Sequence, residues 1–238
     1  MGPVGSMTAP PVPLLSVVIP VGPGDEAWRA LLPALLPEVA GRGEVLLSAT
    51  TPAPEDLGRV TAGGEVRWCD GPAGRARQQN RAAARARGRF LWFLHADSAP
   101  VPGTVPILLG ALARDPGAMW YFDLHFQADG PRAVLLNEAG AWVRSRALGL
   151  PFGDQGLALA RDRFEALGGF REDVPYGEDH LLVWAARRAG CAVRPIGLPL
   201  GTSARRYREQ GWLRTTARFA ARTWAQALPE AWRWLRTR

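Results

Sequence analysis

"FLWFLHADS" (residues 90–98) is a run of five apolar residues that ends at a histidine and an aspartate. A short, unbroken apolar run of this kind indicates a strand that is buried on both faces of a sheet. In open α/β sheets, ligands bind beside the carboxyl ends of the parallel strands. His95 and Asp97 therefore stand where an α/β protein would hold its ligand.

The segments before this run alternate between strand and helix. Apolar and β-branched runs predict strands at 14–21, 44–50, 65–70 and 89–96, and helical spacing predicts helices at 25–40, 54–62 and 74–88. Strands and helices that alternate at this spacing form right-handed βαβ crossovers. The first half is thus predicted to be a parallel, doubly wound sheet.

The second half is less regular. We expect helices at 101–115, 131–149 and 178–190, a helical turn at 161–170, and a long basic helix from about residue 208. The alternation of apolar and polar residues at 118–127 predicts a half-buried strand. We also expect a loop that runs into a short strand at 151–160, and a late strand at 191–198. Without an internal repeat or a linker, residues 14–238 are predicted to form one domain after a flexible leader at 1–13.

The composition is that of a folded globular protein, with 47% apolar and 21% charged residues among 238. No apolar run approaches the roughly 20 residues that span a membrane, and the N-terminus lacks the pattern of a signal peptide. Cys69 and Cys191 are too few for a disulfide framework, so we expect buried free thiols and a cytoplasmic protein. A net charge of +7, carried by 29 arginines and no lysine, indicates an anionic partner: nucleic acid, an anionic membrane or a phosphorylated substrate.

Two segments suit a ligand that carries a diphosphate. Hard cations such as Mg²⁺ or Mn²⁺ take few protein oxygens and complete their shell with phosphate and water, so one carboxylate such as Asp97 is enough to anchor one. The helix predicted at 74–88 follows Gly74 and carries Arg77, Asn80 and Arg81 in its first two turns. A helix N-terminus attracts anions, and arginines there can hold phosphate in a bidentate manner.

Three later segments carry polar clusters. In "YGEDH", Glu178 and Asp179 begin a helix, where a carboxylate can meet a substrate hydroxyl and take its proton. The segments "FGDQG" and "TSARRY" contribute Gly153, Asp154 and Gln155, and Arg205, Arg206 and Tyr207.

Each of these segments also has a purely structural interpretation. Asp97 can cap the turn that follows it, His95 can be a satisfied core residue, and the arginine-rich helix can present a solvated face. A carboxylate at the start of a helix stabilises that end by roughly 0.3–1 kcal/mol, which accounts for one of Glu178 and Asp179 but not for the pair. The loop clusters are equally explained as solvated surface.

In this order, the segments resemble the family 2 glycosyltransferases. The matching run is "SVVIP … GRARQQNRAAARARG … FLHADS … FGDQG … LGGF … YGEDHLLVWAARRAG … TSARRY", which covers residues 14–220. It is most similar to a short bacterial subgroup without membrane spans, whose members carry L-H-A-D and S-A-R-R segments, the latter followed by Trp or Tyr. The resemblance implies a GT-A fold, a Rossmann-like and mostly parallel sheet flanked by helices. Residues 14–100 would be the nucleotide-binding half and 101–238 a continuous acceptor-binding half.

The resemblance also implies a hexosyltransferase-like enzyme that moves a sugar from a nucleotide-diphosphate donor to a hydroxyl acceptor, with inversion. Asp97 would bind Mn²⁺ or Mg²⁺, with His95 in the place of the other metal-binding acid. Asp179 would take the acceptor's proton, and Glu178 would position it. The implied donor contacts are Pro20, Gly74, Arg77, Asn80, Arg205, Arg206 and Tyr207, and the acceptor side would be shaped by Gly153, Asp154 and Gln155.

Two segments depart from the family pattern. The polar residues that usually follow the first strand are displaced and joined by proline in "VGPGDEAW" (21–28). The aspartate that usually ends the second strand is missing, since no acid occurs between Glu44 and Glu55. Three alternatives follow for the donor: a different nucleotide, binding through backbone groups, or loss of the donor site.

The C-terminal helix interleaves arginines with Trp212, Phe219, Trp224, Trp232 and Trp234. These aromatic residues either pack on the core or lie on anionic lipid. In the second case the protein is peripheral at the inner face of the membrane, which suits a lipid-linked acceptor. Two alternative functions stay open: an inactive GT-A-like protein that binds membrane or polyanion through this helix, and a nucleotidyltransferase. No nucleic-acid partner is expected.

Overall fold

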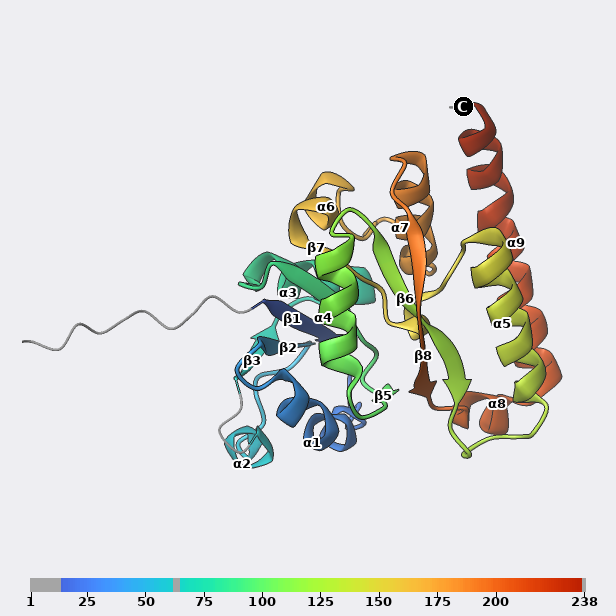
Figure 1. The fold of residues 1–238 in the computed structure, drawn as a ribbon. Coiled ribbons are helices and arrows are strands. Elements are labelled where there is room, and N and C mark those ends of the chain that lie inside the picture. The colour runs from blue at the N-terminus through green and yellow to red at the C-terminus, as the bar shows by residue number, and fades with distance from the viewer. Residues whose placement is uncertain (1–13, 62–64, 237–238) are drawn as a thin grey trace, which may run out of the picture.

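In the computed structural model, one mixed sheet runs through the described residues, 14–61 and 65–236. Its strands lie in the order β3-β2-β1-β4-β7-β6-β8-β5 (Figure 1). The leader expected at 1–13 lies outside the described residues. The sheet passes from the first half of the sequence to the second where β4 meets β7, so both halves share it.

The first half of the sheet is parallel, as the alternation of strand and helix predicts. β1 pairs with β2 and β4, and β2 pairs with β3. His95 and Asp97 follow β4, at the edge where the carboxyl ends of these strands meet. The bounds are β1 (Leu15–Pro20), α1 (Trp28–Val39), β2 (Gly43–Ala49), α2 (Leu57–Thr61), β3 (Val66–Asp70), α3 (Arg75–Arg85) and β4 (Phe90–Phe93).

The second half adds antiparallel pairs. β7 (Ala158–Ala160) is antiparallel to β4 and to β6 (Met119–Phe126), and β6 is parallel to β8 (Val193–Thr202). β5 (Ala99–Pro100), which the sequence does not predict, pairs with β8 at the edge of the sheet. Two residues give no periodic signal, and proline is tolerated in a strand at such an edge.

Helices cover both faces of the sheet. α1, α2 and α4 (Thr104–Arg114) pack on one face, in a core cluster that includes Val17 and Leu108. α3, α6 (Arg161–Ala166) and α7 (Glu178–Arg188) pack on the other, in a cluster that includes Val18 and Leu182. Neighbouring residues of β1 and β4 belong to opposite clusters, which explains why their sequences are continuously apolar.

The strand expected at 118–127 is buried more completely than its alternation predicts. The first four residues of β6 are all buried, and Tyr121 is only 1% exposed. α5 (Val134–Leu148) covers the face that the alternation assigns to solvent, and the Tyr121 hydroxyl donates to the carbonyl of Ser145 at 3.0 Å. The expectation of a half-buried strand is therefore wrong for this part of β6.

The long C-terminal helix is interrupted. α8 (Arg205–Gln210) and α9 (Trp212–Arg236) are separated by Gly211, whose φ is +82°. Residues with a side chain rarely adopt this left-handed conformation, so glycine is suited to the break. α9 continues along α5 and α7 at the far side of the molecule from β3 (Figure 1).

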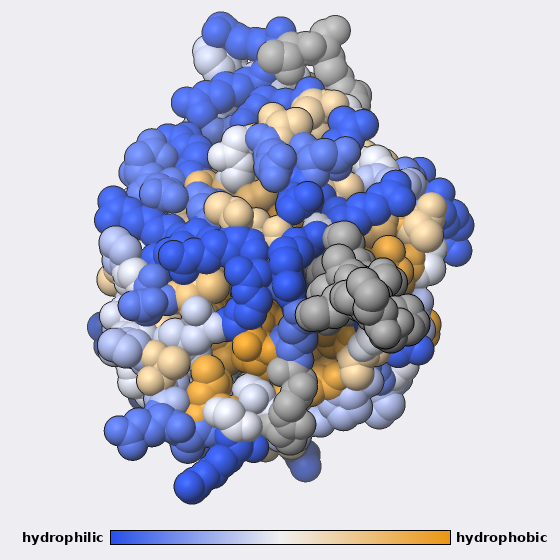
Figure 2. Space-filling view, turned by 90° about the vertical axis from the view of Figure 1, so that its left-hand side faces the viewer, coloured by the Kyte–Doolittle hydropathy of each residue, from blue (hydrophilic) through white to orange (hydrophobic). Residues whose placement is uncertain are grey.

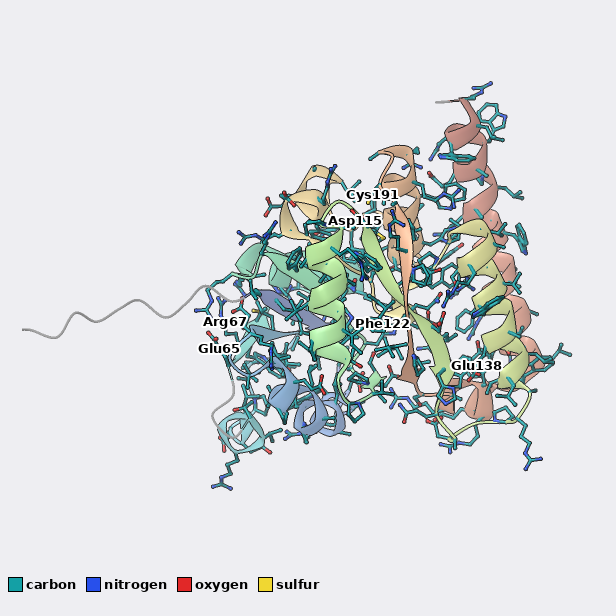
Figure 3. The ribbon with its side chains drawn as sticks, in the orientation of Figure 1. Glu65, Arg67, Asp115, Phe122, Glu138 and Cys191 are labelled. Carbon is teal, nitrogen blue, oxygen red and sulfur yellow. The ribbon has the colours of Figure 1, made fainter. Side chains whose placement is uncertain are left out.

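The amino-terminal ends of the strands are held by a buried carboxylate. Glu44 has no exposed surface, and it accepts hydrogen bonds from the Ser16 hydroxyl at 2.8 Å and from the Arg87 backbone at 2.6 Å. Its other oxygen accepts from Arg87 Nε at 3.0 Å and Arg67 Nη1 at 3.1 Å. Burial alone raises the pKa of Glu44, but these bonds outweigh it and hold the pKa below its ordinary value. Arg67 and Glu65 mark this edge of the sheet in Figure 3.

Both cysteines are free thiols, as expected. Cys69 is buried, whereas Cys191 is only half-buried and donates through Sγ to the carbonyl of Gly117 at 3.0 Å. Cys191 is therefore less buried than expected. It lies near Asp115, at one end of the sheet (Figure 3).

Candidate active site

The candidate site lies at the carboxyl ends of β1, β2 and β4. Pro20 is the last residue of β1, and the Gln78 amide of α3 donates to the carbonyls of Val21 and Ser48, both at 2.6 Å. Gln78, which the sequence analysis does not single out, therefore ties together the ends of β1 and β2. The structure places no carboxylate at the end of β2, in agreement with the sequence.

His95 stands in the turn after β4, where its backbone N–H donates to Ser98 Oγ at 3.1 Å. Its Nε2 contacts the Arg75 guanidinium. Because a guanidinium only donates, Nε2 must be the unprotonated nitrogen of a neutral ring. Burial, followed by the charge of Arg75, lowers the pKa of His95 well below 6.5. His95 is therefore neutral at physiological pH.

Arg75 connects α3 to the start of α7. Its Nε lies 3.2 Å from Glu178 Oε1, and Glu178 is only 7% exposed. Burial raises the pKa of Glu178, and Arg75 opposes the rise. Sequence spacing singles out Arg77 and Arg81 on this helix and misses Arg75. The available signal was its place as the first helical residue after Gly74, next to the sheet edge.

Asp179 is held by two backbone amides. Gly153 N donates to Oδ2 at 2.5 Å, and His180 N donates to Oδ1 at 2.8 Å. Burial raises the pKa of Asp179, but Arg75 and these amides lower it below its ordinary value. A β-carbon at position 153 would lie 2.6 Å from Oδ2 and 3.0 Å from Arg75 Nη2, so only glycine allows this close approach.

Asp154 is a second carboxylate beside Asp179. Its Oδ1 is buried and has no hydrogen-bond partner among the described residues. Burial raises the pKa of Asp154 to about 6, with the charges of Asp179 and Asp97 adding to the rise and Arg144 opposing it. Asp154 thus lies within electrostatic reach of both aspartates, which the sequence places far apart.

Gln155 shapes the loop that carries Gly153 and Asp154, the short 3₁₀ helix η1 (Gly153–Gln155). It is fully buried, and its amide donates to the Phe122 carbonyl at 2.9 Å, in the middle of the molecule (Figure 3). Its Oε1 accepts from Arg144 Nη2 at 3.1 Å, and the Arg144 guanidinium lies 3.6 Å from the centre of the Phe152 ring. Arg144, on α5, is a further residue that sequence reasoning missed.

α8 lies over the side of the site that contains Asp97. Asp97 is half-buried, and its carboxylate forms no ion pair with the described residues. Burial raises its pKa, while the charges of Arg205 and Arg206 oppose the rise. Arg205 also lies 3.9 Å from Asp25, in the loop after β1. The charges of both arginines therefore act on Asp97.

Two residues fix α8 in this place. Asp129 accepts from the Ala204 backbone at 2.7 Å and from the Ser203 hydroxyl at 2.5 Å, which caps the start of the helix. The Tyr207 ring packs edge-on against Phe126 with centroids 5.4 Å apart. Burial, followed by the charge of Asp154, raises the pKa of Tyr207 to about 12. Asp129 was not identified from the sequence.

Arg77 and Asn80 are engaged elsewhere on α3. Arg77 is more than half exposed and lies 3.6 Å from Glu172. The Asn80 amide donates to the Phe170 carbonyl and to Glu172, both at 2.8 Å, and accepts from Phe170 N at 2.9 Å. Arg77 and Gly74 line a cavity of about 270 Å³ that also touches Glu178. Arg77 thus lies beside Glu178, across this cavity, and the Asn80 side chain holds the loop at Phe170 through its hydrogen bonds.

A divalent cation fits this site only in part. Among residues 14–61 and 65–236, no three histidine, cysteine, aspartate or glutamate side chains come together as a metal centre. Asp97 offers a carboxylate without an ion-pair partner, but His95 Nε2 is occupied by Arg75. A cation at Asp97 would depend on phosphate and water for most of its ligands, as Mg²⁺ commonly does.

Neither family models nor curated proteins match this sequence. Solved structures do match its fold. TarS from S. aureus has a TM-score of 0.61 at 14% identity, over 80% of this chain and 36% of that one. TarS 1–349 in complex with UDP-GlcNAc has a TM-score of 0.60 at 14% identity, over 80% and 58%. The mannosyltransferase PcManGT from Pyrobaculum calidifontis, in complex with GDP-Man and Mn²⁺, has a TM-score of 0.58 at 18% identity, over 82% and 59%.

The chain has a GT-A-like fold. This confirms the architecture predicted from the order of the sequence segments. The GT-A-like chain spans 36–59% of the length of the structures named above. At 14–18% identity, the likeness concerns the fold.

Proposed function

We propose that this chain is a glycosyltransferase that moves a sugar from a nucleotide-diphosphate donor to a hydroxyl acceptor, with inversion at the anomeric carbon. The main support is the convergence of Asp97, Asp154 and Asp179 on one edge of the sheet, faced by arginines from α3 and α8. TarS 1–349 with UDP-GlcNAc and PcManGT with GDP-Man, which share the fold, agree with such a donor.

The donor diphosphate would lie between Asp97 and α8. Arg205 and Arg206 are exposed at the start of α8 and face Asp97, so they are free to pair with phosphate oxygens. Asp97 would hold a divalent cation, with phosphate and water as most of its other ligands. When bound, the cation supplies positive charge that stabilises the departing diphosphate. The arginines stabilise the same charge from the opposite side.

The proton of the acceptor hydroxyl would go to Asp179. As the hydroxyl oxygen bonds to the anomeric carbon, the bond from that carbon to the diphosphate oxygen breaks, and the nucleoside diphosphate leaves with the electron pair. Because the pKa of Asp179 is lowered, this carboxylate stays ionised and takes the proton only as the bonding oxygen becomes acidic. Glu178 would act indirectly, by holding Arg75 against Asp179.

Asp154 is a second candidate for the proton acceptor. Its Oδ1 has no partner among the described residues, and a pKa of about 6 matches an operating pH near neutrality. Asp179, by contrast, already accepts one backbone hydrogen bond on each oxygen. In either assignment the acceptor hydroxyl lies beside η1, so the two carboxylates share one substrate group.

Donor binding is the first test. With Mn²⁺ present, a uridine, guanosine or thymidine diphosphate at about 100 times its Kd should stabilise the protein by about 2.7 kcal/mol, which corresponds to a Tm rise of roughly 5–10 °C. Asp97→Asn should abolish the Mn²⁺-dependent part of this rise. Asp162→Asn, which removes an exposed carboxylate on α6, is the matched control and should keep it. The proposal fails if no diphosphate raises the Tm of the unmodified protein, or if Asp97→Asn responds equally.

A further inference from the structure

α5 and α9 expose large apolar side chains to an unusual degree. Of the described residues, all exposed large apolar side chains except Leu14 and Ile107 lie on these two helices. On α5 they are Leu135, Leu136, Trp142, Val143 and Leu148, and on α9 they are Leu213, Trp224, Leu228, Trp232 and Leu235. Each is between 50% and 72% exposed. Contiguous apolar surface of this kind marks an interaction site.

The exposed residues of α9 form one stripe. At 3.6 residues per turn, Leu213, Trp224, Leu228, Trp232 and Leu235 fall within about 100° of arc. Thr215, Ala227 and Glu230 lie outside that arc and are buried against the rest of the molecule. Trp212 and Trp234 also pack inward, so the helix divides its aromatic residues between the core and the surface.

The two helices lie side by side. The Asn137 amide of α5 donates to Thr216 Oγ1 at 3.1 Å and accepts from Trp212 Nε1 at 2.6 Å, both on α9. Figure 1 shows the pair at the side of the molecule opposite β3. Figure 2 views the β3 side, where hydrophilic residues predominate around a smaller apolar area. The two adjacent helices therefore form one side of the molecule, the α5–α9 face, on which α9 carries the apolar stripe and α5 carries further exposed apolar residues.

Positive charge flanks the stripe of α9. Arg214, Arg218, Arg222, Arg233 and Arg236 project from the arc beside it, by the same helical spacing. Glu230 is the acid of this helix, and it is only 3% exposed because it pairs with Arg188 and Arg233. The matching surface must consequently be apolar and anionic. A second copy of the chain does not meet this condition, because it would bring two arginine rows together.

We propose that the α5–α9 face docks on an anionic lipid bilayer, with α9 in the plane of the interface. An interfacial helix of this type carries aromatic and aliphatic residues on one face and arginines beside them. Among the described helices, none is long and apolar enough to cross a membrane, which leaves the in-plane arrangement. At 1.5 Å per residue, the 25 residues of α9 give a contact about 37 Å long. This inference goes beyond the proposed transfer reaction and does not depend on it.

Vesicle flotation tests the docking face. The full chain, without donor, should float with vesicles of phosphatidylcholine mixed with phosphatidylglycerol, and at least about tenfold less with phosphatidylcholine alone or in high salt. The double variant Trp224→Gln, Leu228→Gln should bind the mixed vesicles at least tenfold more weakly. Ile107→Gln on α4, which also removes an exposed apolar side chain, is the matched control and should bind as the unmodified chain does.

A second pair of substitutions separates charge from apolar contact. Arg214→Gln with Arg236→Gln should weaken binding to the mixed vesicles severalfold and reduce its salt dependence. All four positions are exposed, so circular dichroism should show an unchanged fold. The proposal is overturned if the unmodified chain binds neither kind of vesicle, or if the Trp224 and Leu228 variant binds normally. It is also overturned if light scattering shows a dimer that this variant splits, without vesicle binding. Failure here would leave the diphosphate-dependent Tm rise untouched.

Discussion

The two ends of the same sheet differ in how many partners their buried carboxylates have. At the amino end, Glu44 is fully buried and accepts four hydrogen bonds from Ser16, Arg87 and Arg67. At the carboxyl end, the buried Oδ1 of Asp154 has no partner, and Asp97 has no ion pair among the described residues. Burial raises the pKa of all three carboxyls, and of the three only Glu44 has partners that bring its pKa below the ordinary value. Asp179 is the exception at the carboxyl end, because Arg75 and two backbone amides lower its pKa.

This difference distinguishes a carboxylate that stabilises the fold from one that is available to a ligand. A buried charge with a complete set of partners restrains the strands around it, and losing a partner is costly. A buried carboxylate without partners lowers stability, and it is retained where a ligand can complete its interactions. By this criterion Glu44 contributes to stability, whereas Asp97 and Asp154 have interactions that a ligand could complete.

The largest expected effect is on the carboxyl end. Asp179→Asn should lower turnover about 10²–10⁴-fold, because the amide cannot take the acceptor's proton, while the diphosphate-dependent Tm rise should persist. Turnover is measured as release of nucleoside diphosphate from the nucleotide sugar. Full turnover by this variant, together with loss in Asp154→Asn, would assign the proton to Asp154 instead.

The next largest expected effect is a loss of stability when Glu44, at the amino end of the sheet, is replaced. Glu44→Ala should lower the free energy of unfolding by about 3 kcal/mol, since it leaves the Ser16 hydroxyl and the Arg87 amide without their acceptor. Urea unfolding measures the loss, and diphosphate binding should be unchanged. The control is Glu65→Ala, which removes the half-exposed partner of Arg87 and should cost less than about 1 kcal/mol. Equal losses in the two variants would contradict the distinction between the ends of the sheet.

The smallest expected effect is a gain in stability, in the variant Asp154→Asn. The folded-state pKa of Asp154 is about 6, above its ordinary 3.8, so the unmodified protein loses stability as the pH rises through this interval. Asp154→Asn lacks that titration. Above pH 6 it should be more stable by about 1 kcal/mol, less than the full 1.36 kcal/mol per pKa unit because the residue as a whole is only partly buried. Thermal unfolding at a pH above 6 and at one below 4 measures the difference. A variant that is equally stabilised at both would disprove the assignment.

The sequence predicted the strands of the first half, and it named Asp97, Asp154 and Asp179 as site residues, because strand ends and helix starts have strong local signals. It did not predict Arg75, Arg144 or Gln78. Their roles depend on how a long side chain bends from a helix toward a neighbouring loop, which spacing along that helix does not encode. β6 was misjudged for a related reason, since the covering helix α5 comes later in the chain.

The C-terminal aromatic residues divide between the core and the surface. Trp212 and Trp234 pack on the core clusters, whereas Trp224 and Trp232 are 59% and 56% exposed. Helical periodicity gives the relative directions of side chains on a helix, but not which direction faces the rest of the molecule. That choice is made by contacts such as the ion pair between Arg188 and Glu230.

Gly211 joins α8, whose arginines are proposed to bind the diphosphate, to α9, whose exposed apolar stripe is proposed to contact lipid. With φ at +82°, this one residue sets the angle between them, and a side chain there would strain it. Because this single residue joins the two helices, a fixed position of α9 would also restrict where Arg205 and Arg206 can lie. If the lipid docking proposed for α9 holds, binding to a bilayer would also orient the candidate site relative to the membrane surface.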